Sequence, residues 1–103
     1  MKESTTRENV LRAIEYVEHP EIAATLGDLG MILDVSVQDK IAKVAMTLPT
    51  REIPEAIKNA LIDNIGQPIE KLGLQLQVEF FEMTAEARGK FFALARANWK
   101  GSI

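Results

Sequence analysis

The side chains that could do chemistry are few in this chain, and this excludes most classes of active site. Among 103 residues there is no cysteine and a single histidine, His19. The chain alone therefore cannot provide a catalytic thiolate, a cysteine-ligated zinc site, a cysteine-held iron–sulfur cluster or a site of several histidines. Serine occurs only at Ser4, Ser36 and Ser102, so a Ser/His/Asp triad would have to combine one of them with His19.

The remaining candidates for a polar site lie in two segments without a regular apolar pattern. His19, Glu21 and Asp28 lie in the first segment, and Glu52 lies in the second. Together they could form a small metal-binding or enzymatic site, but nothing in their spacing makes the ligands converge. We expect Glu21 and Asp28 to bind backbone amides instead, with Asp28 fixing a turn, and the His19 imidazolium to lie beside the C-terminus of a helix. We expect no catalytic residue, no metal and no cofactor.

A second group of candidates precedes a predicted helix that begins with Pro54. The hydroxyl groups of Thr47 and Thr50 could either cap amides of that helix or face a ligand at its N-terminus, and we expect capping. Arg51 could attract an anion there, but we expect a solvated side chain.

Apolar residues recur at helical or alternating spacing in six segments that must position these candidates. We expect helices over 6–18, 54–65 and 85–98, and strands over 31–37, 41–48 and 72–80. Thr5 and Glu8 have the spacing of a capping box, Thr84 can cap the last helix, and Gly66 with Pro68 should end the second. In the first strand, Met31, Leu33, Val35 and Val37 should share one face.

These elements predict an α+β fold in the order α-β-β-α-β-α, with residues 1–103 forming one domain. The short connection 38–40 predicts a hairpin, and the helix between the second and third strands predicts a right-handed crossover between parallel strands. We therefore expect a three-stranded mixed sheet with helices on one face.

Overall charge and hydrophobicity narrow the environment and the partners. The net charge of −3 gives no general attraction to nucleic acid. No run of residues approaches the ~20 apolar positions of a membrane span, and the polar start of the sequence has no signal-peptide pattern. We expect a cytoplasmic protein that binds neither nucleic acid nor membrane.

The last segment differs from the rest in charge and aromatic content. Residues 84–103 carry four basic side chains and one acidic one, whereas residues 1–83 carry eight and fourteen. Phe91 and Phe92 are adjacent and point about 100° apart on a helix, so one face is unable to bury both fully. With Arg96 and Trp99 they form a predicted partner-binding surface, and a homodimer would be its simplest closed arrangement.

Three short motifs resemble the SufT/PaaD-like family of iron–sulfur cluster assembly domains. The motifs are His19-Pro20-Glu21-Ile22, Asp28-Leu29-Gly30-Met31-Ile32 and Thr47-Leu48-Pro49-Thr50-Arg51-Glu52-Ile53-Pro54. The resemblance covers 5–82 and leaves 83–103 as an extra C-terminal helix. His19 stands where the family has aspartate, and Arg51 and Glu52 stand where it has proline and glycine. Ile53 stands at the position of the family's cysteine and is unable to ligate a metal.

The resemblance implies a non-catalytic accessory or adaptor protein in iron–sulfur cluster assembly or metalloprotein maturation, acting through contacts with other proteins. A small subunit or assembly factor of a multicomponent metalloenzyme is an alternative, since PaaD-like members suggest one. A metal-binding or enzymatic domain using His19, Glu21, Asp28 and Glu52 is the third.

Overall fold

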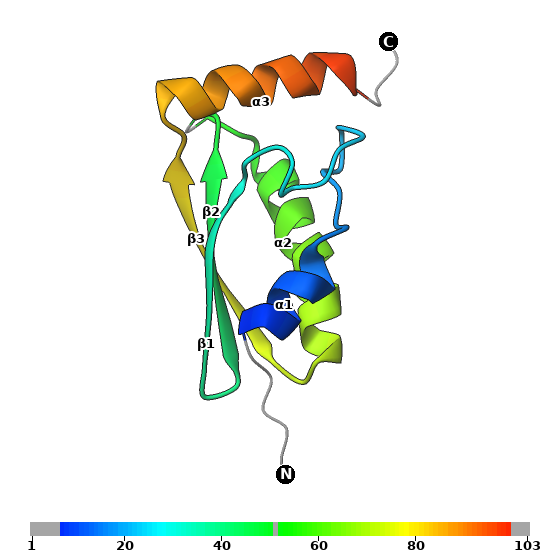
Figure 1. Ribbon diagram of the computed structural model, residues 1–103, viewed down its shortest axis with the longest axis vertical. Coiled ribbons are helices and arrows are strands. Elements are labelled where there is room, and N and C mark those ends of the chain that lie inside the picture. Colours follow the sequence, from blue (N-terminus) through cyan, green and yellow to red (C-terminus); the bar gives the residue numbers. More distant parts are fainter. Residues whose placement is uncertain (1–6, 51, 100–103) are drawn as a thin grey trace.

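A computed structural model describes residues 7–50 and 52–99, and it confirms the predicted α+β fold and element order. The elements are α1 (Arg7–Ile14), β1 (Ile32–Gln38), β2 (Ile41–Leu48), α2 (Glu55–Lys71), β3 (Gln75–Glu82) and α3 (Ala85–Ala97) (Figure 1). Within the described ranges, no helix combines the length and the apolar character needed to cross a bilayer.

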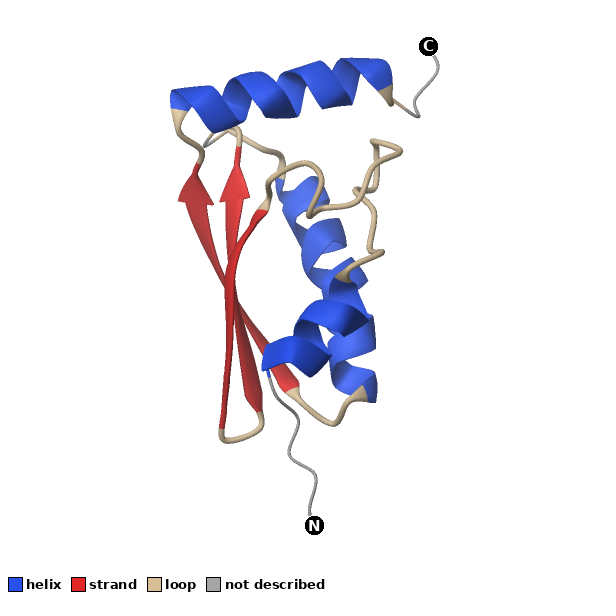
Figure 2. Ribbon diagram, viewed as in Figure 1, coloured by secondary structure: helices blue, strands red, loops and turns tan. Residues whose placement is uncertain are grey.

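The sheet has the predicted mixed topology. Its order is β1-β2-β3, with β1 antiparallel and β3 parallel to β2. Asp39 and Lys40 have φ values of 52° and 66°, which the tight turn of the β1–β2 hairpin requires. Helices α1 and α2 cover one face of the sheet, whereas α3 lies across the end at which β2 and β3 terminate (Figures 1 and 2). The third helix therefore closes an end of the domain, which the prediction of helices on one face did not include.

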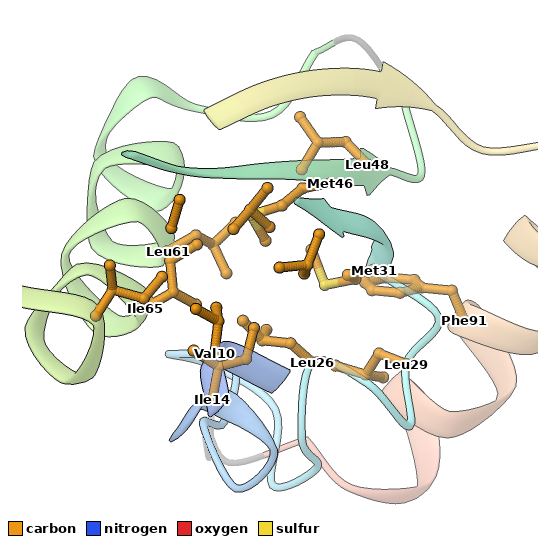
Figure 3. Packing of buried hydrophobic residues seen from close by; sticks show 14 of the residues in the cluster. Val10, Ile14, Leu26, Leu29, Met31, Met46, Leu48, Leu61, Ile65 and Phe91 are labelled. Carbon is orange, nitrogen blue, oxygen red and sulfur yellow. The ribbon is translucent and has the colours of Figure 1, made fainter. Parts of the chain in front are cut away.

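The hydrophobic core lies between the sheet and the first two helices. On β2 the side chains of Ala42, Val44 and Met46 are fully buried, as the alternation predicted. They face Leu61 and Ile65 of α2, and Figure 3 shows the same core extending to Met31 and to Phe91 of α3. Burial of the apolar stripe of α2 thus fixes that helix against the sheet.

The alternation predicted for β1 is wrong at Leu33. The pairing of β1 with β2 shifts between Ile32 and Asp34, so one residue of β1 has no partner. Such a bulge turns the following side chains over by one position. Val35 is consequently buried, while Leu33 is 61% exposed.

The first helix is shorter than its apolar pattern predicted. It ends at Ile14, and in the turn that follows the Val17 amide donates to the Ile14 carbonyl at 3.1 Å. The chain then reverses its direction, and the Leu26 amide donates to the Val17 carbonyl at 2.9 Å. Thr5 of the predicted capping box lies outside the described residues.

The second helix continues through the two residues predicted to end it. Gly66 is buried under β3, and Pro68 lies inside the helix. Ile65 and Ile69 are both fully buried, so continuing the helix keeps two large side chains in the core. The free energy gained by burying these two side chains exceeds the cost of the hydrogen bond that proline removes. The helix ends instead at Lys71, and Gly73, two residues further on, has a φ of 82° that suits the position after a helix cap.

A connector, residues 15–31, joins α1 to β1 and is held against the end of β2. Thr47 of β2 makes two hydrogen bonds to the end of the connector. Its amide donates to the Met31 carbonyl at 2.8 Å, and its hydroxyl donates to the Gly30 carbonyl at 2.8 Å. Gly30 has a φ of 75°, a region that other residues rarely adopt. The glycine and the threonine of the two motifs therefore act together as a structural junction.

Replacing Gly30 and Gly89 by alanine should change stability in opposite directions. Neither new methyl group would meet an atom within 4 Å, so only the backbone conformation matters. Gly30→Ala should lower the free energy of unfolding by about 1 kcal/mol, because φ is positive there. Gly89→Ala in α3 should raise it by about 0.5–1 kcal/mol. Urea unfolding of both variants measures this, and a stabilising Gly30→Ala would contradict it.

Thr47→Val should weaken the junction while preserving side-chain shape. Thr47 is 7% exposed, so the Gly30 carbonyl would lose a buried partner. We expect a loss of about 1–3 kcal/mol in the free energy of unfolding. Thr47→Ser, which keeps the hydroxyl, serves as the control in thermal unfolding. A destabilised Thr47→Ser beside an unchanged Thr47→Val would show that the methyl group matters and the hydrogen bond does not.

Candidate functional site

A cleft of about 830 Å³ lies between α3, the start of α2 and the first part of the connector. Its floor is made of buried apolar side chains: Ile22, Met31, Leu48, Leu61, Phe91 and Ala95. Figure 3 shows Met31 and Phe91 approaching each other from the connector and from α3. The site is therefore an apolar hollow formed by segments far apart in the sequence.

The rim of the cleft exposes two aromatic rings of the last segment. Phe92 is 39% exposed and Trp99 is 49% exposed, while their neighbour Phe91 is 5% exposed. The Phe91 and Phe92 rings meet edge to face with centroids 5.4 Å apart. The prediction that one helix face would not bury both phenylalanines is thus confirmed.

The ends of α3 are both tied to the rest of the domain. At the start, the Thr84 hydroxyl accepts from the Ala87 amide at 3.1 Å, which confirms the predicted cap. Nε of Arg88 donates to the Pro49 carbonyl at 2.7 Å. At the far end, the Ala23 amide donates to the Asn98 carbonyl at 2.7 Å. These contacts hold the helix across the cleft.

Charge at the cleft is sparse. Among the described residues that line it, Glu21 has a carboxylate, Arg96 has a guanidinium and His19 has an imidazole. Arg96 forms no ion pair with any other residue of the described ranges 7–50 and 52–99. An exposed guanidinium beside exposed aromatic rings is a composition typical of the centre of a protein interface. All four residues of the predicted partner-binding surface line the cleft.

His19 lies in the wall of the cleft, with 6% of its surface exposed. Its Nδ1 accepts a hydrogen bond from the Glu21 amide at 2.9 Å, so this nitrogen carries no proton. The ring meets Phe91 edge-on, with centroids 6.3 Å apart. The histidine therefore orients the connector beneath α3, and its neutral ring differs from the imidazolium we expected at the helix C-terminus.

The two threonines do not cap α2, so that prediction is wrong. Residue Pro54 precedes the helix and the helix has no side-chain cap. The Thr47 hydroxyl instead serves the junction with Gly30, and the Thr50 hydroxyl accepts from the Glu52 amide at 3.2 Å within the loop. Thr50 also lines the cleft, beside Ile53.

The acidic candidates are not brought together. Glu21 lines the cleft, but Asp28 and Glu52 do not. The Asp28 amide donates to the Thr25 hydroxyl at 3.0 Å in an exposed turn, so its backbone is part of the predicted turn. Within the described ranges, no group of three histidine or acidic side chains has a metal-binding arrangement. Arg51 lies outside the described residues.

Sequence patterns did not reveal the cleft itself. Its floor uses Ile22, from a segment whose spacing predicted neither helix nor strand, and Met31, which we predicted as the first residue of a strand. Only the aromatic surplus of the last helix indicated that some apolar surface would remain outside the core.

Comparison with solved structures finds a domain with a similar fold. A domain of unknown function, DUF59, from Bacillus anthracis has a similar crystal structure, with a TM-score of 0.65 and 18% sequence identity. The similarity covers 86% of this chain and 91% of the other. At this identity it shows a common fold. No curated protein matches the sequence.

Comparison of the sequence with family models identifies the family. The model of the iron–sulfur cluster assembly proteins matches residues 7–74. This range contains all three motifs and ends before β3, so α3 lies outside it. The resemblance of the motifs to SufT/PaaD-like domains is confirmed, and the family indicates a role in iron–sulfur cluster assembly. The chain belongs to the family of iron–sulfur cluster assembly proteins.

Proposed function

We propose that this protein is a non-catalytic adaptor in iron–sulfur cluster assembly or metalloprotein maturation, and that it acts by binding other proteins through the cleft. Family membership supports the pathway. The observation that carries the mechanism is the apolar cleft with Phe92, Arg96 and Trp99 at its rim. A partner segment with an apolar side chain would fill the hollow while its polar backbone meets the rim.

The cleft offers more for binding a protein than for chemistry. Its floor provides hydrophobic area, and the exposed aromatic rings add contacts of the kind that dominate interface energies. His19 already uses Nδ1 to hold the Glu21 amide, and that use keeps the ring in a positioning role. We infer that the buried histidine shapes the wall of the cleft.

The chain supplies no thiolate to a cluster, because it has no cysteine and has Ile53 at the family's cysteine position. Ile53 lines the cleft together with Ile57 and packs against the core. In this proposal a cluster is cargo whose thiolate ligands belong to partner proteins. The isoleucine adds apolar surface at the position where a ligand would otherwise lie.

Deletion of the gene in the source organism, followed by complementation, tests the proposed function. We expect the activity of iron–sulfur enzymes to fall several-fold, with unchanged amounts of those proteins, and wild-type protein to restore it. Phe92→Ser and Arg96→Glu should restore it poorly, because they change the rim. Tyr16→Ser is the matched control, since Tyr16 is 79% exposed and does not line the cleft. Full restoration by both rim variants would contradict the role of the cleft.

The wild-type chain should hold no stable cluster after anaerobic reconstitution, because it lacks thiolates. Ile53→Cys should fold, with a loss of about 1–2 kcal/mol in the free energy of unfolding from the removed carbons. Iron and sulfide analysis with absorbance spectra measures the first expectation, and urea unfolding measures the second. A stoichiometric cluster on the wild-type monomer, or gross unfolding of Ile53→Cys beside a folded Ile57→Cys, would contradict these expectations.

A further inference from the structure

The outer edge of β3 is an unpaired strand edge within the part of the chain that the structure describes. β3 is at the end of the sheet order β1-β2-β3 and is eight residues long. Its charged residues are Glu79 and Glu82, both in its second half. Long edge strands with few charges present free amides and carbonyls that can pair with another strand.

Two hydrogen bonds show which groups of β3 point outward. The Gln75 amide donates to the Lys40 carbonyl at 2.9 Å, and the Met83 amide donates to the Leu48 carbonyl at 2.8 Å. Both bonds run toward β2. In a parallel pair the residues that bond to one neighbour alternate with those that face away from it. The amides and carbonyls of Leu76, Val78 and Phe80 therefore point to the outer edge.

We propose that a second copy of this chain binds this edge, with the two β3 strands antiparallel about a two-fold axis at Val78. The outward groups of Val78 then bond to those of the second copy's Val78, and those of Leu76 bond to those of Phe80. On the inner face, Leu76 lies opposite Phe80 and the two Val78 side chains lie opposite each other. On the open face, Gln77 lies opposite Glu79.

Other two-fold registers of the same edge are poorer. An axis at Glu79 would place two carboxylates directly opposite each other, which is unfavourable across strands. An axis at Phe80 would place Val78 opposite Glu82. An axis at Gln77 would require Leu74, which precedes the strand and is buried, to pair with Phe80. The axis at Val78 pairs residues 75–81, most of the strand, without such conflicts.

Charges beside the edge are complementary in the same register. A groove of about 440 Å³ between α2 and the first half of β3 is lined by Asp63, Glu70 and Leu76, among others. A second groove of about 320 Å³, at the other half, is lined by Lys58 and Phe80 among others. Because Leu76 lies opposite Phe80, the acidic groove of each copy adjoins Lys58 of the other, whose ammonium lies 3.9 Å from the exposed carboxylate of Glu55 in its own chain.

One acidic side chain of the second groove is already neutralised. Glu82 lies 3.5 Å from the Arg88 guanidinium, so its carboxylate repels the acidic groove of the second copy only weakly. The cleft and the second groove share only Leu48 and Thr50 among their lining residues. A dimer formed at β3 therefore leaves the rim of α3 available, in contrast to the sequence-based expectation that the last helix would dimerise.

Two substitutions at Gln77 give the sharpest test, because this exposed residue pairs with Lys43 in its own chain and with Glu79 of the second copy. Gln77→Glu should stabilise the monomer beside Lys43 but weaken dimerisation roughly fivefold, since two like-charge pairs form across the axis. Gln77→Lys should destabilise the monomer beside Lys43 but strengthen dimerisation, because the lysine lies opposite Glu79 of the second copy. Sedimentation equilibrium at low salt gives the dimer dissociation constant, and thermal unfolding gives the stability.

Cross-linking checks the register independently. The chain has no cysteine, so Val78→Cys introduces a single thiol near the proposed axis. Mild oxidation should give a covalent dimer several-fold faster than Ser36→Cys, an exposed position on β1. A wild-type chain that stays monomeric at millimolar concentration would overturn the proposal. A dimer dissociation constant that is the same for both Gln77 variants would overturn it as well. So would a Val78→Cys chain that forms the covalent dimer no faster than Ser36→Cys.

Discussion

The double contact of Thr47 with the connector is the interaction on which the rest of this domain depends. The connector has no helix or strand of its own, so its position is set by where its last residues attach. Through the carbonyls of Gly30 and Met31, one residue of β2 holds both the start of β1 and the wall of the cleft. Because these bonds are mostly shielded from water, losing one leaves an acceptor without a partner. The sheet, the core and the candidate site thus share one junction.

Most of the fold could be predicted from the sequence, because its strongest signals are local. The hairpin and the parallel β3 follow from alternation and from the length of the intervening helix. The errors have two physical causes: tertiary burial overrides the local preference of a helix, and a bulge changes the alternation of a strand. Ile65 and Ile69 carry α2 past Gly66 and Pro68, and a bulge that no alternation reveals turns Leu33 out to solvent.

The candidate site could be predicted only in part. The aromatic residues of the last helix and Arg96 were identified from composition, and they line the cleft. The partners that complete it, Ile22 and Met31, were not, because their positions depend on long-range contacts of the connector. The polar residues of the motifs serve mainly as structural elements: Thr47 holds a junction and His19 orients a loop. In this chain the motifs therefore specify the walls of the site.

The attachment of α3 at both ends has a consequence for the kinetics and thermodynamics of docking. A helix tied at Pro49 and at Ala23 is unable to swing as a hinged lid would. A partner that binds as proposed would therefore meet a hollow whose backbone is already in place, and little chain entropy would be lost beyond the rotamers of Phe92 and Trp99. Association should then be limited by orientation of the two molecules, with selectivity expressed mainly in dissociation rates.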